Sequence, residues 1–337
     1  MSSTLPTNFP VLQVDLTGRT ALVVGSNVGL GFEAAKHLAR MNPKRLIATA
    51  RTEEKSKKTE EEIKKDTGFS AVECWPLELT SFASIKAFAD RFEPMADPTY
   101  VITEDGFERL WVLCFYSYSN IDTDCLSPSS LQTNHLGGAL LSYLLLPTLL
   151  KTGRETGHVS RLAIVSSNLH ECVNFGLEKF PKDRDIFARM NEKDSLNTNV
   201  GDLANRYSET KLLNILFGRA LQSHLSADAP LLVTLPNPGL SISELGRSDN
   251  SGQWDEVLKT ARTTEEGSRQ LILGALGEKG GVNAWRGAYL SDNEIRDVSE
   301  WVRSDEGREA QERVWKETLI IASKADARVA ETAKLFV

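Results

Sequence analysis

The feature that most constrains the fold is a glycine-rich turn between a strand pattern and a helix pattern near the N-terminus. Residues 20–25 (TALVVG) form a short apolar run that is typical of a buried strand. Residues 31–41 follow with apolar side chains spaced along one face of a helix. The turn that joins them has the spacing G-x-x-x-G-x-G and consists of Gly25, Ser26, Asn27, Val28, Gly29, Leu30 and Gly31. This pattern predicts the first βα unit of a parallel sheet.

The alternation of strand and helix patterns continues along the chain. Further strands are predicted at 45–50, 71–77, 161–167 and 231–235, and helices at 53–66, 81–92, 136–150, 203–225, 255–276 and 298–323. No internal repeat, low-complexity tract or linker marks off a second domain. We therefore predict an α/β fold for residues 1–337, a single domain with a doubly wound, Rossmann-like parallel sheet and a C-terminal helical extension.

The composition argues against several classes of protein. A hydrophobic fraction of 41% and a charged fraction of 25% are ordinary for a globular chain, and a net charge of −7 gives no reason to expect a nucleic-acid partner. The four cysteines show no paired spacing and no metal-ligand pattern with the histidines, so we expect no metal and a reduced, cytoplasmic protein. The N-terminus lacks the basic and apolar regions of a secretory signal. Residues 136–150 are apolar but short for a membrane span, and they contain Pro147, which favours a buried helix over a membrane segment.

The glycine turn predicts a dinucleotide site. Glycines let the backbone approach a diphosphate, and free N–H groups at the start of the following helix attract its charge. The second strand is followed by Arg51, with Lys55 one turn later, where a carboxylate would favour NAD. Cations here favour the 2′-phosphate of NADP(H). Two plainer interpretations stay open, an ordinary glycine-rich turn and an Arg51 that only pairs with Glu53 or Glu54.

A tyrosine and a lysine on the helix predicted at 203–225 are candidates for acid–base chemistry. Tyr207 and Lys211 are four residues apart and share one face of that helix. A phenol has a reference pKa of roughly 10, and a nearby ammonium lowers it, so that the phenol exchanges protons more readily near neutrality. Ser167 ends an apolar strand, where a hydroxyl can bind a developing oxyanion. Asn134 begins the apolar helix, where its plain structural role would be a helix cap.

Taken together, these motifs resemble the short-chain dehydrogenase/reductase family over about residues 16–245. The segments 131–147 (LQTNHLGGALLSYLLLP) and 237–245 (NPGLSISEL) look like fungal members that tailor secondary metabolites. The resemblance implies hydride transfer between NADP(H) and a carbonyl or alcohol carbon of a small molecule.

The resemblance also implies roles for single residues. Tyr207 would be the acid/base, Ser167 would polarise the carbonyl, Lys211 would hold the nicotinamide ribose and tune Tyr207, and Asn134 would support a proton-relay water. Glu78 and Leu79 would lie near the adenine, Pro238 and Gly239 would pass the nicotinamide, and Ser243 would lie near its amide. The predicted cofactor contacts are therefore Gly25, Ser26, Asn27, Gly29, Leu30, Gly31, Arg51, Lys55, Glu78, Leu79, Tyr207, Lys211, Pro238, Gly239 and Ser243.

Some segments depart from the family pattern. Val24 replaces a threonine whose hydroxyl steadies the glycine turn. The family has an N-N-A-G-like stretch after its fourth strand, where this sequence has residues 111–118. Residues 109–130 therefore look out of place, and form either a rewritten fourth strand or an insertion with the usual strand missing. Residues 168–206 separate Ser167 from Tyr207 by more than the usual distance, and we interpret them as a lid over the substrate pocket, with a surface excursion as the alternative. Residues 246–337 would add a substrate-side loop and C-terminal helices.

Two hypotheses on function follow. The first is an NADP(H)-dependent ketoreductase or alcohol dehydrogenase that acts on a small, polycyclic or polyketide-like molecule, which the intact Ser-Tyr-Lys set favours. The second is a non-catalytic or repurposed member, either a cofactor-binding scaffold or a cyclisation catalyst without net redox chemistry, which the altered residues 109–130 favour. The apolar helices at 136–150 and 203–225 would suit a homodimer or homotetramer, unless the C-terminal extension covers them.

Overall fold

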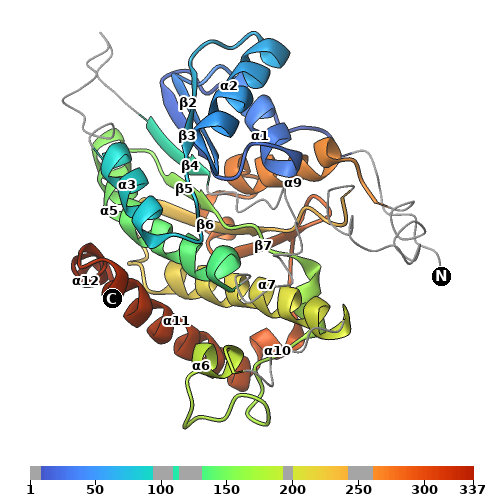
Figure 1. The fold of residues 1–337 in the computed structure, drawn as a ribbon, viewed down its shortest axis with the longest axis vertical. Helices are drawn as coiled ribbons and strands as arrows, with labels where there is room; N and C mark the ends of the chain where they lie inside the picture. The colour runs from blue at the N-terminus through green and yellow to red at the C-terminus, as the bar shows by residue number, and fades with distance from the viewer. Residues whose placement is uncertain (1–8, 94–108, 114–130, 193–199, 242–260) are drawn as a thin grey trace.

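A parallel sheet with helices on both faces forms the centre of the protein (Figure 1). The structure is a computed structural model that describes the chain except for residues 1–8, 94–108, 114–130, 193–199 and 242–260. Its strands are β1 (Arg19–Val23), β2 (Arg45–Ala50), β3 (Val72–Pro76), β4 (Arg109–Leu113), β5 (Ser160–Ala163), β6 (Leu231–Pro236), β7 (Ala288–Ser291) and β8 (Glu294–Arg296). They pair in the orders β3-β2-β1-β4 and β5-β6-β7-β8, and β4 lies beside β5, so the two halves continue each other. This arrangement confirms the predicted α/β fold.

Each face of the sheet has its own apolar core. The helices α1 (Gly29–Arg40), α2 (Glu53–Thr67) and α9 (Thr264–Leu276) cover one face, and α3 (Phe82–Phe92), α5 (Gly137–Thr156) and α7 (Val200–Ser223) cover the other (Figure 1). Along β1, Leu22 packs into the core below α5 and α7, whereas Ala21 and Val23 pack into the core below α1 and α9. A parallel strand that is buried on both faces needs such an unbroken apolar run, as the sequence has here.

The segment whose role the sequence left open contains the fourth strand. β4 pairs in parallel with β1, in register from Arg19 with Arg109 to Val23 with Leu113. The first alternative, a rewritten fourth strand, therefore holds for residues 109–113. The rest of that segment, residues 114–130, lies outside the described part of the chain.

Two predicted helices have different bounds because serine or threonine side chains start helices there. α9 begins at Thr264 and not at 255, since Thr263 and Glu266 form a reciprocal capping box; residues 255–260 are outside the described residues. The helix predicted at 298–323 is two helices, α10 (Glu300–Arg303) and α11 (Asp305–Ala325). The break falls at Ser304, whose hydroxyl accepts the N–H of Gly307.

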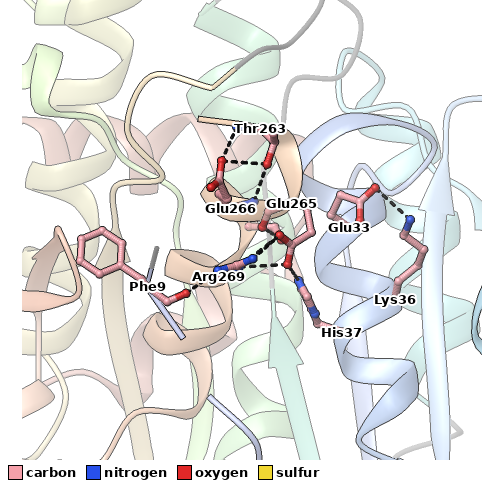
Figure 2. A network of polar contacts seen from close by, with 9 residues as sticks. Phe9, Glu33, Lys36, His37, Thr263, Glu265, Glu266 and Arg269 are labelled. Carbon is pink, nitrogen blue, oxygen red and sulfur yellow. Dashed lines mark hydrogen bonds and ion pairs between the residues drawn. The ribbon is translucent and has the colours of Figure 1, made fainter. Parts of the chain in front are cut away.

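A polar network joins α1 to α9 above their shared core (Figure 2). Glu265 of α9 lies between the two helices, with one carboxylate oxygen 2.9 Å from His37 Nε2 of α1 and the other 2.5 Å from Arg269 Nη2. The hydrogen bond from Arg269 is the main cause that lowers the pKa of Glu265. Arg269 also donates to the carbonyl of Phe9 at 2.6 Å, which ties the N-terminal segment to α9. The network therefore fixes α9 against the helix that follows the glycine turn.

The C-terminal helices cover the face formed by α5 and α7. α11 packs on α7 and α5, and α12 (Arg328–Thr332) packs on α5 (Figure 1). Trp315 of α11 is 5% exposed, and its ring centroid lies 5.6 Å from that of Tyr143 and 6.1 Å from that of Phe217. The C-terminal extension of this chain thus covers the apolar faces of α5 and α7. Of the two alternatives for these faces, a second subunit or the extension, the structure shows the extension.

The apolar helix predicted to be buried is buried. Residues 132–156 are long and apolar enough to cross a membrane by length and composition alone, but 78% of the apolar stretch is buried inside the fold. It comprises a π-helical turn, η4 (Gln132–Leu136), followed by α5. Its side chains, from Leu140 to Leu150, contribute to the core between the sheet and α11.

The described part of the segment between Ser167 and Tyr207 is fixed to α11. Arg313 of α11 donates to the carbonyls of Phe180 and Pro181 at 2.9 and 3.0 Å. Glu317, one turn further, accepts the N–H groups of Ile186 and Phe187 at 2.9 and 3.0 Å, and so holds α6 (Ile186–Met190). Its role as a lid stays a prediction, but the segment lies docked on the C-terminal extension.

Replacement of Trp315 by alanine tests whether α11 is part of the folded core. A buried tryptophan deleted to alanine costs about 3–5 kcal/mol of unfolding free energy, and the loss here would uncover the apolar faces of α5 and α7. Urea denaturation of Trp315→Ala measures it, with Ile320→Ala as the control, because Ile320 lies on the same helix and is 53% exposed. Equal stability of the two variants would contradict the packing.

Candidate active site

The glycine turn between β1 and α1 has a valine, Val28, at the N-cap position of the helix. Gly25 and Gly29 have φ values of 76° and 68°, which L-residues rarely adopt. Val28, the residue before α1, is extended and provides no side-chain bond to the helix start. The start of α1 therefore presents backbone N–H groups of the kind that suit an anion.

Hydroxyl groups from two other positions steady this turn in place of the threonine that Val24 replaces. Thr49 of β2 accepts the N–H of Gly25 on its Oγ1 at 2.9 Å. The fully buried Ser26 donates its hydroxyl to the carbonyl of Val23 at 2.7 Å, and its N–H to the carbonyl of Thr49 at 2.8 Å. The hydroxyl of Thr49 in β2 therefore takes the place of the threonine hydroxyl that Val24 lacks, and the sequence did not predict this.

Arg51 and Glu78, both predicted to contact the cofactor, lie next to each other. Arg51 Nε is 3.9 Å from Glu78 Oε2, and both side chains are about one-third exposed. The plainer interpretation of Arg51 as an ion-pairing residue named Glu53 or Glu54, but the carboxylate beside it is that of Glu78, which follows β3. Lys55 is exposed, and its N–H donates to the Thr52 hydroxyl that caps α2. The Arg51 guanidinium remains partly open to a ligand at the end of β2.

Leu79 lies against the start of the apolar helix because Gly137 has no side chain. A Cβ on Gly137 would fall 2.3 Å from the carbonyl oxygen of Leu79. Gln132 also donates to that carbonyl, at 3.4 Å. This close approach brings the end of β3 beside η4, which carries Asn134.

Asn134 reaches across to the helix that carries the tyrosine. Its Nδ2 donates to Thr210 Oγ1 at 2.8 Å, and Thr210 in turn donates to the carbonyl of Tyr207 at 2.7 Å. The helix-cap interpretation is therefore wrong, since the amide bonds α7 and not its own helix start. Asn134 is fully buried and its Oδ1 has no hydrogen-bond partner among the described residues, so this acceptor is left for a bound group.

Lys211 is held between the tyrosine and the end of β5. It is 1% exposed, its Nζ lies 5.4 Å from the centroid of the Tyr207 ring, and it donates to the carbonyl of Val165 at 3.5 Å. Val165 is two residues before Ser167, so the predicted lysine, tyrosine and serine come from α7 and the strand end beside it. A buried ammonium next to a phenol stabilises the phenolate form.

Ser167 follows β5 and begins the 3₁₀ turn η5 (Asn168–Cys172), against which α7 packs. Its hydroxyl accepts the N–H of Leu169 at 3.2 Å and lies 3.4 Å from Asn168 Oδ1. His170 fixes the backbone of the serine, because its Nδ1 lies 2.6 Å from the Ser167 carbonyl oxygen. The neighbouring Ser166 is turned away, with its hydroxyl on the carbonyl of Leu235.

The loop after β6 is locked by an arginine that the sequence analysis missed. Arg262 is 2% exposed; it donates to the Pro238 carbonyl at 3.1 Å and pairs with Asp292 at 2.7 Å. Gly239 has a φ of 74°, and a Cβ there would lie 2.6 Å from the Arg262 Nη1. Only a glycine fits beside this guanidinium. The predicted contact Ser243 lies outside the described residues.

Gly267 of α9 joins this loop to the glycine turn. A Cβ on Gly267 would lie 2.2 Å from Ser241 Oγ and 2.7 Å from Leu30 Cδ2. Leu30 at the start of α1 and the loop that follows Pro238 and Gly239 therefore lie close together. The contact of Gly267 had no signal in the sequence, since this glycine lies inside the α9 helix.

The residues present fit a dinucleotide. The start of α1, where Val28 makes no side-chain cap, suits its diphosphate, and the partly exposed Arg51 suits a phosphate on the adenosine ribose. Asn134 Oδ1, unpaired among the described residues, and the buried Lys211 suit polar groups at the nicotinamide end. The elements that carry them meet at the carboxyl ends of the parallel strands, where ligands bind in open α/β sheets.

Comparisons with known proteins show what the chain is similar to. The family model for short chain dehydrogenases matches residues 19–168. The short chain dehydrogenase sol3 of Alternaria solani is 36% identical over 296 residues, which cover 88% of this chain and 94% of that protein. The short chain dehydrogenase/reductase dmxR8 of Cryptosporiopsis sp. (strain 8999) is 32% identical over 329 residues, or 95% of this chain and 94% of that protein.

Among solved structures, NADPH-bound carbonyl reductase from chicken fatty liver superposes with a TM-score of 0.55 at 18% identity, over 85% of this chain and 94% of that chain. At this identity the likeness concerns the fold. The sequence relatives settle the family: the chain belongs to the short-chain dehydrogenase/reductase family of oxidoreductases.

Burial of a histidine next to this site makes the stability depend on pH. His135 is 1% exposed, and burial lowers its pKa to about 4. Between pH 6.5 and 4 the unfolded chain binds a proton that the folded chain does not, so stability falls as the pH falls through this window, by about 3 kcal/mol in total. Urea unfolding at pH 7 and at pH 4.5, for the wild type and His135→Gln, measures the difference. An equal pH dependence of both proteins would contradict it.

Proposed function

We propose that this protein is an NADP(H)-dependent oxidoreductase that interconverts a ketone or aldehyde and an alcohol on a small molecule of secondary metabolism. The observation that carries the proposal is the buried Lys211, 5.4 Å from the ring of Tyr207 and bonded to the carbonyl two residues before Ser167. Burial of a charged group costs free energy, so buried charges in proteins are paired or take part in function. The resemblance to fungal members that tailor secondary metabolites supports the substrate class.

In the proposed reduction, NADPH supplies the hydride, and the side chains manage the proton and the charge on oxygen. Ser167 donates a hydrogen bond to the carbonyl oxygen of the substrate, on which negative charge develops. Tyr207 donates its phenolic proton to that oxygen. The ammonium of Lys211 stabilises the resulting phenolate, and Asn134, whose Oδ1 is unpaired among the described residues, accepts from a water that returns the proton.

The preference for NADP(H) rests on Arg51. Its guanidinium lies at the carboxyl end of β2, is 36% exposed, and has its Nε 3.9 Å from Glu78 Oε2. A guanidinium binds a phosphate through charge-assisted hydrogen bonds. These are stronger than the hydrogen bonds that it can form with the neutral 2′-hydroxyl of NAD(H). That the carbonyl reductase of similar fold was crystallised with NADPH supports this choice.

Replacement of Tyr207 by phenylalanine is expected to lower kcat by about 10²–10⁴-fold, because it removes the proton donor. NADPH binding, measured by nucleotide fluorescence, is expected to persist. Oxidation of NADPH against a panel of ketones and aldehydes gives the rates, with Tyr143→Phe as the matched control, because the Tyr143 hydroxyl is buried in α5 and has no hydrogen-bond partner in the described part of the chain. Full activity of Tyr207→Phe would refute the assigned mechanism. A wild type that binds NADPH but reduces no carbonyl would favour the scaffold hypothesis.

Replacement of Arg51 by alanine is expected to weaken NADPH binding by about 10–100-fold, the value of a hydrogen bond to a charged group, and to leave NADH binding unchanged. Calorimetric titration with both nucleotides measures this. Arg45→Ala is the control, since Arg45 begins the same strand at its other end, has the same 36% exposure, and also pairs with a carboxylate, that of Glu73. Equal losses for both nucleotides would overturn the assignment to the 2′-phosphate.

A further inference from the structure

A chain of buried side chains runs from the C-terminal helix to the carbonyl that accepts Lys211. Its members come from α11, η4 and α7, and each is at most 2% exposed: Thr318, His135, Asn214 and Lys211. His135 Nε2 lies 3.1 Å from Thr318 Oγ1, and His135 Nδ1 lies 3.2 Å from Asn214 Oδ1. Asn214 Nδ2 then donates to the carbonyl of Val165 at 3.3 Å, the same oxygen that accepts Lys211 Nζ.

The direction of the hydrogen bonds in this chain follows from its ends. Because Asn214 uses its NH₂ group on Val165, its oxygen faces His135, and an amide oxygen only accepts. His135 Nδ1 therefore carries the proton, and Nε2 accepts the hydroxyl proton of Thr318. The imidazole is neutral in this arrangement, and burial, which lowers its pKa to about 4, keeps it so. One tautomer satisfies every member of the chain.

Aromatic rings hold the imidazole in this orientation. The ring of Phe187, in α6, stacks on His135 with centroids 5.5 Å apart, and Phe217 of α7 contacts its edge at 5.6 Å. His135 thus contacts the segment after Ser167, the tyrosine helix and the C-terminal extension.

We propose that His135 is a positioning residue of the active site: its neutral Nδ1–H tautomer holds Asn214, which with Lys211 shares the Val165 carbonyl and so fixes the lysine beside Tyr207. Thr318 anchors this arrangement from α11. The position of the lysine therefore depends on the C-terminal extension, which lies outside residues 19–168 that match the family model. The inference rests on the proposed function insofar as Lys211 serves catalysis.

The test is His135→Phe, which keeps a ring of similar size but removes both hydrogen bonds. A small displacement of Lys211 is expected to lower kcat by roughly tenfold and to weaken NADPH binding several-fold. It is also expected to shift the pH profile of kcat/KM to higher pH, because the ammonium that stabilises the Tyr207 phenolate is displaced. The control is Leu149→Ala, which destabilises the same helix assembly from a fully buried position in α5 without touching the chain. It is expected to lower stability but to keep the wild-type pH profile.

Rescue by the conservative variant distinguishes positioning from packing. His135→Gln can still donate an N–H to Asn214, and is expected to recover most of the kcat and the wild-type pH profile. A His135→Phe variant with lowered stability but with wild-type kcat and pH profile would overturn the proposal. So would a His135→Gln variant that is as impaired as His135→Phe.

A measurement without turnover separates this inference from the proposed function. ¹⁵N spectra of histidine-labelled protein at pH 7, with the His135 signal assigned by its loss in His135→Gln, are expected to show a neutral ring protonated on Nδ1. If the wild type reduces no carbonyl, the proposed function fails, and the tautomer together with the loss of NADPH affinity in His135→Phe still decides the inference. A ring protonated on Nε2, or an unchanged affinity, would refute it.

Discussion

The burial of one ammonium group determines how the elements of this protein meet. Lys211 is 1% exposed, and a charge removed from water must be hydrogen-bonded or paired to be tolerated. Its acceptor is the carbonyl of Val165, just beyond β5, so α7 has to lie along the end of that strand. The same contact places Tyr207 and Ser167 on neighbouring elements. The geometry of the candidate site and the docking of α7 at the end of β5 therefore share one hydrogen bond.

The nucleotide half of the site depends on the end of β2 in a comparable way. Thr49 accepts the amide of Gly25 and so supplies, from the neighbouring strand, the hydroxyl that Val24 does not. Two residues later the chain presents Arg51, with Glu78 beside it. One short segment thus fixes the turn that suits a diphosphate and presents the cation that suits the additional phosphate, so both features have a common support.

The architecture and the glycine turn were predictable because they follow from local patterns. Apolar runs and helical periodicity report burial directly, and they gave the parallel sheet and the buried helix at 136–150. The predicted bounds were wrong where a side chain overrides periodicity, as at Ser304, whose hydroxyl caps α11 inside a segment predicted as one continuous helix. The role of residues 109–113 stayed open because a short apolar run does not reveal its partner strand, and pairing with β1 decided it.

The sequence by itself determined the fold class, the turn that suits a dinucleotide and the spacing that puts Tyr207 and Lys211 on one helical face, since each depends on residues within a few positions of each other. Only the tertiary structure decided which residues support them. Asn134 bonds Thr210 rather than capping its helix, and Arg262 locks the loop at Gly239. His135 joins Asn214 to Thr318, although Thr318 is 183 residues from His135 in the chain. Hydrogen bonds between distant segments leave no periodicity in the sequence; they form because buried polar groups must find partners wherever the packed sheet and helices bring them together.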